Sequence, residues 1–280
     1  MGIEPTAAEA RRVLDHAVRA AAEEFGPALS AAFALGSLAH GGFAPLVSDV
    51  DLALVLDPVG DASSAAVARV AERSRGELAG PLAARLSIFW ADWAGVRHGV
   101  PPGTPGRLPA VDRLDLLDAG RLLHGTDHRH PAEPPDAAEL VRDSAEFVRD
   151  RFDAGYLARL HDPDALLADG VRPVTKAVLF PVRFLFTLSR GQIGHNSAAA
   201  AWYVRAGRPG GGLVGAALGW RDTGIGDPAA ARRLLADGLP ALYRELLDDY
   251  AAAMRESGAG DLADALARRS QVLGRLGAAG

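Results

Sequence analysis

The amino-acid sequence predicts a mixed α/β sheet with flanking helices, followed by an all-α helical domain. Short apolar segments at 31–35, 50–56 and 86–90 have the length of strands, and a helical pattern separates the second from the third. From Asp136 onward, apolar residues recur with a helical period almost throughout. A stretch rich in proline lies between these two patterns. The chain of 280 residues is long enough for two cores, and we expect domains at 1–130 and 136–280.

The first predicted element is a helix that begins after Thr6 and ends before Gly26. Thr6 and Glu9 have the spacing of a capping box, in which each side chain accepts a hydrogen bond from the backbone of the other residue. An amphipathic pattern follows, and Gly26 with Pro27 then ends the helix. The apolar segment 31–35 predicts a short strand that ends at a Gly-Ser turn.

The second strand is expected at 50–56, where a nearly continuous apolar run indicates burial on both faces of a sheet. Asp61 is a candidate cap for a helix that continues to about Leu78. The third strand is expected at 86–90. Several prolines and glycines between 95 and 109 predict a loop, which is long enough to face a substrate.

An apolar pattern returns at 111–125, and the proline-rich residues 128–135 then predict a linker. Beyond the linker we expect helices, with glycine-rich breaks at 210–212 and 224–226 and a connection between helices at 207–215. The predicted helices span 137–160, 171–189, 197–206, 228–236, 239–255 and 261–276.

Composition excludes several classes of protein. The formal net charge of -5 gives no basic surface for non-specific nucleic-acid binding, so no nucleic-acid partner is expected. The absence of cysteine excludes disulfides and thiolate metal sites. The sequence shows no signal-peptide pattern and no apolar run of membrane-spanning length. We therefore expect a cytoplasmic protein without a membrane partner.

The segment LGSLAHGGFAPLVSDVDLALVL at 35–56 carries the chemistry. Asp49 and Asp51 are two residues apart at the start of a predicted strand, so both side chains point to one face. Two carboxylates there suit Mg²⁺, which prefers oxygen ligands and completes its shell with substrate phosphates. Gly36 allows the backbone to approach a phosphate closely, and Ser37 adds a hydroxyl donor. The combination predicts metal-assisted transfer of a nucleotidyl group.

Each half of this segment also has a purely structural interpretation. An Asp-x-Asp pair at a strand end is usually a solvated turn, and Gly-Ser pairs are common. The order of the two halves, each next to an apolar strand, favours the functional interpretation. Three histidines that are close in sequence, His124, His128 and His130, fit no standard zinc spacing, and we do not expect a metal site there.

The pairs GS and GG and the triplet DVD, in this order within 36–51, resemble the nucleotidyltransferase superfamily. The closer resemblance is to the bacterial aminoglycoside adenylyltransferases that act on streptomycin and spectinomycin. The segment GRLLHGTD at 120–127 is similar to the one that closes the N-terminal domain in that family. RFLFTLSRGQI at 183–193, followed by AAAAW at 198–202, resembles the helix and turn that carry its nucleotide-binding basic residues.

The resemblance implies transfer of AMP from ATP to a hydroxyl of a small polar acceptor, with an aminoglycoside antibiotic favoured and antibiotic resistance as the role. It implies that Asp49 and Asp51 bind two Mg²⁺ ions, which offset the charge that develops on the transferred phosphoryl group. It also implies that Ser37, beside Gly36, contacts the nucleotide phosphates. Arg183 would neutralise phosphate charge from the helical domain. The sequence leaves the oligomeric state open.

Two positions depart from the pattern of the family. The family has a third carboxylate on the next strand, as general base for the acceptor hydroxyl. Our register places Arg85 there, and an arginine cannot accept a proton. Asp92, just past that strand, is the candidate replacement if the strand end bends inward. Asn196 stands where relatives carry a lysine, which weakens one phosphate contact. The predicted site therefore comprises Asp49, Asp51 and Asp92 for catalysis and Gly36, Ser37, Arg183 and Asn196 for the nucleotide.

The missing general base leaves other functions open. A protein of the same fold that binds nucleotide without transferring it is the main alternative, and Arg85 favours it. A toxin-like nucleotidyltransferase acting on RNA or protein is a weaker one, because no basic face is expected. A cationic acceptor would favour an acidic cleft, for which Asp143, Glu146 and Asp150 are candidates on one predicted helix.

Overall fold

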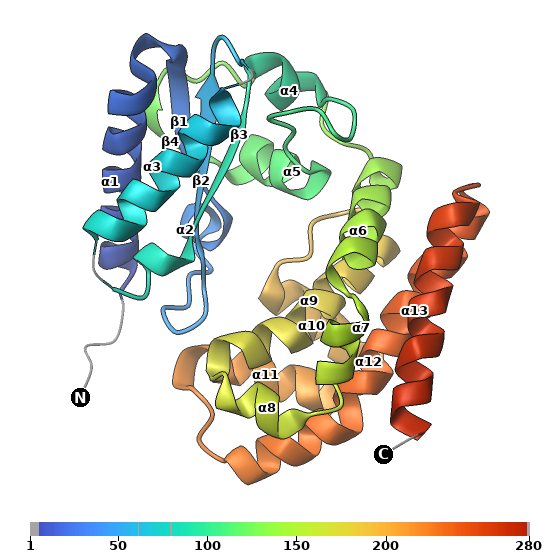
Figure 1. The fold of residues 1–280 in the computed structure, drawn as a ribbon. Helices are drawn as coiled ribbons and strands as arrows, with labels where there is room; N and C mark the ends of the chain where they lie inside the picture. Colours follow the sequence, from blue (N-terminus) through green and yellow to red (C-terminus); the bar gives the residue numbers. More distant parts are fainter. Residues whose placement is uncertain (1–5, 61, 79, 279–280) are drawn as a thin grey trace. The chain divides into compact units, whose positions relative to one another are not determined.

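The computed structural model describes residues 6–60, 62–78 and 80–278 (Figure 1). The chain divides into two compact units, Met1–Pro135 and Asp136–Gly280. Each unit has hydrophobic core clusters of its own. Within the described residues, no helix is both long enough and apolar enough to span a lipid bilayer.

A four-stranded mixed sheet forms the centre of unit 1. Its strands are β1 (Leu29–Leu35), β2 (Val50–Leu56), β3 (Leu86–Ala91) and β4 (Arg121–Gly125). The strand order is β3-β2-β1-β4, with β1 antiparallel to both β2 and β4 and with β2 parallel to β3. β1 and β2 are almost entirely buried, which explains why both sequences are nearly continuous apolar runs.

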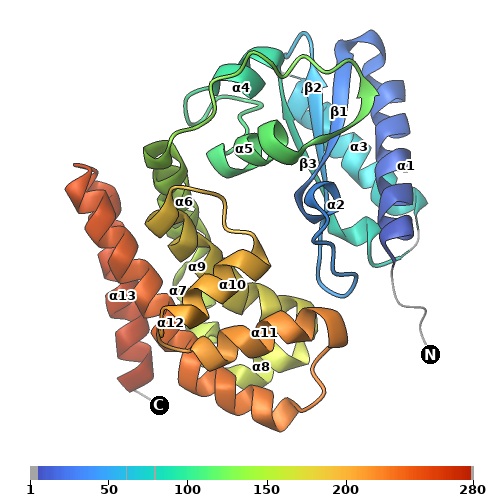
Figure 2. The same ribbon diagram turned by 180° about the vertical axis from the view of Figure 1, so that it is seen from behind.

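Helices cover both faces of this sheet. They are α1 (Ala7–Phe25), α2 (Gly36–His40), α3 (Ser63–Glu77), α4 (Trp93–His98) and α5 (Ala110–Ala119). α1 and α3 pack on the face that carries Leu52 and Leu54, whereas α4 and α5 pack on the face that carries Ala53 and Val55 (Figures 1 and 2). Because strand residues alternate between faces, Asp51 belongs to the α5 side.

The first predicted helix is confirmed together with its capping box. Oγ1 of Thr6 accepts a hydrogen bond from the backbone N–H of Glu9 at 3.2 Å, and Oε2 of Glu9 accepts one from the N–H of Thr6 at 2.7 Å. The helix predicted after the second strand is α3, which begins at Ser63. Its expected cap, Asp61, lies outside the described residues.

Several elements of unit 1 differ from the prediction, among them the helices α2, at the expected Gly-Ser turn, and α5, within the apolar segment 111–125. The expected loop at 95–109 is partly helical, because α4 begins at Trp93 and includes its first residues. β4 was not predicted, and every residue of this strand is exposed. An edge strand that buries neither face has no apolar periodicity by which the sequence would reveal it.

Unit 2 consists of helices packed around one large hydrophobic cluster. The helices are α6 (Ala137–Arg151), α7 (Ala154–Arg159), α8 (Pro163–Ala168), α9 (Val171–Arg190), α10 (Asn196–Arg205), α11 (Gly211–Thr223), α12 (Pro228–Glu256) and α13 (Gly260–Ala278). Buried tyrosines tie the helices together. The hydroxyl of Tyr243 donates to the carbonyl oxygen of Ala177 at 2.9 Å, and that of Tyr250 donates to Phe184 at 2.8 Å.

Helix boundaries in unit 2 differ from the prediction at three places. The predicted helix 137–160 is two helices, because Asp153 accepts a hydrogen bond from the N–H of Tyr156 and starts α7. The predicted helices 228–236 and 239–255 are one helix, α12, which continues through Pro240. Loss of one backbone hydrogen bond at this proline is offset by the buried residues on both sides of it. α11 begins inside the expected glycine-rich connection, because its apolar residues enter the core.

Candidate functional site

The Gly-Ser pair stands where β1 meets α2. Gly36 is the first residue of α2 and has a φ of 60°, a left-handed conformation that favours glycine. A Cβ atom at this position would lie 2.5 Å from Oδ2 of Asp51. The turn therefore packs directly against the carboxylate of the Asp-x-Asp pair, and Ser37 follows as a half-buried residue of α2.

The two aspartates lie at the start of β2. Asp49 immediately precedes the strand, and Asp51 is its second residue. Asp51 pairs in register with Leu35 at the end of β1 and with Ser87 on β3. Both aspartates are partly exposed, and strand alternation directs their side chains to one face. The structure thus brings Gly36 and both aspartates to one end of the sheet.

This donor set fits a divalent metal ion that needs only one or two carboxylates from the protein. Within the described part of the chain, no group of three or more His, Asp or Glu side chains is arranged to hold a metal. Mg²⁺ usually binds proteins through one or two carboxylates and takes its remaining ligands from substrate phosphates and water. Asp49 and Asp51 supply such a pair of carboxylates.

Asp92 does not lie near Asp49 and Asp51, so this part of the predicted catalytic set is wrong. β2 and β3 run parallel, and Asp51 lies opposite Ser87. Asp92 is five residues farther along, which is about 16 Å of strand at about 3.3 Å per residue. Its Oδ1 accepts a hydrogen bond from the N–H of Gly95 at 2.6 Å and caps α4. This cap holds the Asp92 side chain at the start of α4, past the far end of β3.

Arg85 instead lies at the end of β3 that is near the aspartates. It is the last residue of a short 3-10 turn, Ala83–Arg85, and the next residue, Leu86, pairs with Val50. Nη1 of Arg85 donates a hydrogen bond to the carbonyl oxygen of Pro45 at 2.8 Å. The position at which the resemblance places a third carboxylate therefore carries a cation.

A carboxylate from α5 does reach the Gly-Ser turn, and sequence reasoning missed it. Oδ2 of Asp115 accepts a hydrogen bond from the backbone N–H of Gly36 at 2.6 Å. Asp115 is only 9 % exposed. Its neighbours Leu116 and Leu117 are also buried, and a carboxylate within such an apolar stretch requires a hydrogen-bond partner elsewhere. A carboxylate within a buried apolar stretch of the sequence was therefore the signal that could have pointed to Asp115, although it does not identify the hydrogen-bond partner.

In unit 2, Arg183 and the turn before Asn196 lie together. Nε of Arg183 donates to the carbonyl oxygen of Gly194 at 2.6 Å. A Cβ at Gly194 would lie 2.6 Å from the carbonyl oxygen of Arg183, so only glycine allows the turn to pack this closely on α9. Asn196 begins α10 two residues later. Cζ of Arg183 also lies 5.7 Å from the centroid of the Phe180 ring, within cation–π range.

A second arginine of unit 2, Arg221, interacts electrostatically with Arg183. Arg221 of α11 is 7 % exposed. Burial lowers the pKa of Arg221, and the charge of Arg183 lowers it further, while Asp222 acts in the opposite direction. The carboxylate of Asp222 has a larger effect on Arg221 than the charge of Arg183 has, so the two guanidinium groups do not form an uncompensated cationic pair.

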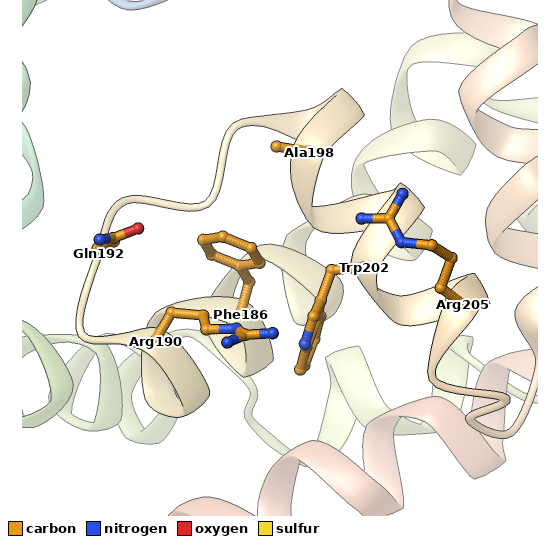
Figure 3. Close-up of a pocket in the computed structure, with 6 residues that line it drawn as sticks. All are labelled: Phe186, Arg190, Gln192, Ala198, Trp202 and Arg205. Carbon is orange, nitrogen blue, oxygen red and sulfur yellow. The ribbon is translucent and has the colours of Figure 1, made fainter.

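A pocket of about 440 Å³ lies between the end of α9 and α10 (Figure 3). The ring of Phe186 meets that of Trp202 edge to face, with centroids 5.6 Å apart. Arg190 and Arg205 contribute two exposed guanidinium groups, and neither forms an ion pair with a carboxylate of the described chain. The pocket also includes Gln192. It therefore combines aromatic surface with positive charge.

The acidic residues considered for a cationic acceptor do not form an open anionic face. Asp143 is 8 % exposed and belongs to the buried side of α6. Asp150 accepts hydrogen bonds from Arg149, and this arginine lowers the pKa of its carboxyl group. Two of the three candidate side chains are thus buried or neutralised locally.

Comparison with known proteins identifies a shared fold. No protein-family model matches the sequence, and no curated protein matches it either. Among solved structures, the chain is similar to the spectinomycin adenyltransferase AAD(9) from Enterococcus faecialis, whose crystal structure contains ATP and spectinomycin. The TM-score is 0.53 at 13% sequence identity, and the match covers 80% of this chain and 98% of the other. The predicted fold class, a mixed sheet with flanking helices followed by an all-α helical domain, is confirmed, and this fold is shared with the adenyltransferase.

Proposed function

We propose that the protein is a nucleotidyltransferase that moves AMP from ATP to a hydroxyl of a small polar acceptor. One observation carries the proposal: Gly36 leaves the space at the turn that the Asp51 carboxylate fills, so the Gly-Ser and Asp-x-Asp halves form one surface. The fold shared with an adenyltransferase supports the same reaction class.

Asp49 and Asp51 would hold two Mg²⁺ ions, and the hydroxyl of Ser37 and the guanidinium of Arg183 would contact the phosphates. The bound metal supplies charge compensation for the attacking and leaving oxygens. The acceptor oxygen forms a bond to the α-phosphorus, the bond from that phosphorus to the bridging oxygen breaks, and pyrophosphate leaves. Asp92 is too distant to take the acceptor proton and Arg85 is a cation, so this proton passes to water.

An aminoglycoside antibiotic is the acceptor we favour, with resistance as the biological role and the cytoplasm, which contains ATP and Mg²⁺, as the location. The unit 2 pocket with Arg190 and Arg205 suits the anionic nucleotide and repels a polycation. We therefore assign that pocket to the nucleotide and place no antibiotic contact there.

The test is release of pyrophosphate from ATP and Mg²⁺ in the presence of streptomycin or spectinomycin. Asp51→Asn removes one metal-binding charge and is expected to abolish release. Asp57→Asn is the matched control, because Asp57 is an exposed aspartate just past the other end of β2. Absence of release with both antibiotics would reject this acceptor class, and absence with a broad panel of hydroxyl compounds would reject transfer.

Arg85 favours a second candidate function, nucleotide binding without transfer. A general base contributes roughly a hundredfold to ten-thousandfold in rate, and this residue cannot act as one. Calorimetric titration with ATP and Mg²⁺, run beside the turnover assay, separates the two candidates. Binding without turnover selects the second, and turnover with any acceptor selects the first.

A further inference from the structure

Oδ2 of the Asp115 carboxylate accepts a hydrogen bond from a backbone amide. The donor is the N–H of Gly36 at 2.6 Å, in a bond between residues 79 positions apart in sequence. Because Asp115 is only 9 % exposed, its carboxylate has lost most of its hydration, and a charge-assisted hydrogen bond of this kind offsets that loss. The bond ties α5 to the junction of β1 and α2.

The position of Gly36, which the bond to Asp115 holds, in turn limits the position of the Asp51 side chain. Oδ2 of Asp51 lies beside the Cα of Gly36, on the side where any other residue would carry its Cβ. A Cβ built there would lie 2.5 Å from this oxygen. A rotation of the Gly36 peptide would therefore change the space that is available to the Asp51 carboxylate. With standard bond lengths, the Oδ2 atoms of Asp115 and Asp51 lie within about 7.5 Å of each other.

We propose that Asp115 is a positioning residue that acts through Gly36 to fix the Asp51 carboxylate and to strengthen its hold on a divalent cation. The inference rests on the proposed function, in which Asp51 is a metal ligand. Asp115 is given no place among the metal ligands, because no group of three or more His, Asp or Glu side chains in the described chain is arranged to hold a metal, and its Oδ2 accepts the amide of Gly36. Asp115 acts by holding the Gly36 turn in place and by adding a negative charge near the Asp51 carboxylate.

The bond has a consequence for phosphate recognition. Because Asp115 occupies the N–H of Gly36, that amide does not donate to a nucleotide phosphate. The hydroxyl of Ser37, one residue later, is another donor at this turn.

The experiment is a titration of the full-length protein with Mn²⁺ alone, followed by electron paramagnetic resonance. Asp115→Asn keeps an oxygen acceptor for Gly36 but removes the charge, and we expect roughly fivefold weaker Mn²⁺ binding. Asp115→Ala also removes the acceptor, and we expect weakening of more than about tenfold. Asp118→Ala is the matched control, because Asp118 is an exposed aspartate on the same helix, and it should bind as the wild type does.

A second readout follows the turn itself. Hydrogen exchange of the Gly36 amide by NMR should be slow in the wild type and in Asp115→Asn and at least about tenfold faster in Asp115→Ala. If Asp115 had only a structural role, its variants would change hydrogen exchange or stability, but Mn²⁺ affinity would not fall from the wild type to Asp115→Asn and further to Asp115→Ala. If Asp115→Ala does not fold, Asp115→Asn decides, and wild-type Mn²⁺ affinity in that variant overturns the proposal.

Asp51→Asn distinguishes failure of the role proposed for Asp115 from failure of the proposed metal-dependent function. If the wild type binds Mn²⁺, Asp51→Asn does not and both Asp115 variants bind normally, the role of Asp115 is rejected while the metal site stands. If neither the wild type nor Asp51→Asn binds Mn²⁺, either alone or with ATP present, the metal-dependent function is rejected and this inference with it.

Discussion

Arg85 and Pro45 are joined by a hydrogen bond of 2.8 Å from Nη1 to the carbonyl oxygen. The bond fastens the start of β3 to the loop that leads into β2. It also holds a positive charge at the end of the sheet where Asp49 and Asp51 project. An arginine that is anchored in this way is part of the local framework, and its replacement probes both catalysis and loop order.

Replacement of Arg85 by glutamate should raise the rate of nucleotidyl transfer. Arg85→Glu supplies a proton acceptor, and general-base catalysis typically contributes about a hundredfold or more. Steady-state pyrophosphate release at saturating ATP and Mg²⁺ measures the effect. Arg85→Gln is the control, because it removes the charge and the Pro45 contact without adding a base. Equal rates for the two variants would mean that charge removal, and not base catalysis, is responsible.

Gly36→Ala should disrupt ATP binding far more than Gly41→Ala does. Both glycines have positive φ, so alanine is strained by about 1–2 kcal/mol at either position. Only at Gly36 does the new Cβ also collide with Asp51, because nothing lies within 4 Å of a Cβ at Gly41. Calorimetry with ATP and Mg²⁺, beside thermal unfolding, separates affinity from stability. Equal affinities in the two variants would contradict the close packing of turn and aspartate.

Removal of the pocket arginines should weaken ATP binding in a salt-dependent manner. We expect roughly tenfold loss for Arg190→Ala or Arg205→Ala, the usual effect of losing a hydrogen bond to a charged group. Arg233→Ala is the control, since Arg233 is an exposed arginine on α12 outside the pocket. If all three variants bind ATP equally at low and at high salt, the pocket does not serve the nucleotide.

Alkaline pH should destabilise the protein through its buried tyrosines. Burial raises the pKa of Tyr250 above its ordinary value of 10.0. Above about pH 10 the unfolded chain therefore loses this proton before the folded one does, and stability falls as pH rises. Tyr250→Phe should lower the free energy of unfolding by about 1 kcal/mol near neutral pH, because the Phe184 carbonyl loses its donor.

The same variant should then be less sensitive to alkali, by up to about 1.4 kcal/mol per pH unit above pH 10. Urea unfolding of Tyr250→Phe and the wild type at a series of pH values measures both effects. An unchanged alkaline slope would show that ionisation of Tyr250 does not contribute to alkaline unfolding.

The strands that form the core could be predicted because burial leaves a direct trace in sequence. β2 is an apolar run between polar ends, and its predicted limits agree with Val50–Leu56. The Gly-Ser turn and the aspartates could be located because they adjoin such strands. β4 leaves no trace, since its side chains are exposed.

The remaining parts of the site depend on contacts between distant segments. Asp92 was a reasonable candidate by sequence distance alone, but strand direction places it at the wrong end of β3. Asp115 reaches Gly36 across 79 positions, and no local pattern encodes that pairing. Spacing along the chain identifies ligand types, whereas the end of the sheet at which they gather is set by tertiary packing.

The division into two units makes the protein a convenient spectroscopic subject. Trp90 and Trp93 belong to unit 1, and Trp202 and Trp220 belong to unit 2. Because each unit has hydrophobic clusters of its own, a single two-state transition is not the expected behaviour. Replacing the tryptophans of one unit by phenylalanine would assign the fluorescence to the other. The unfolding of each unit then becomes visible separately within the intact chain.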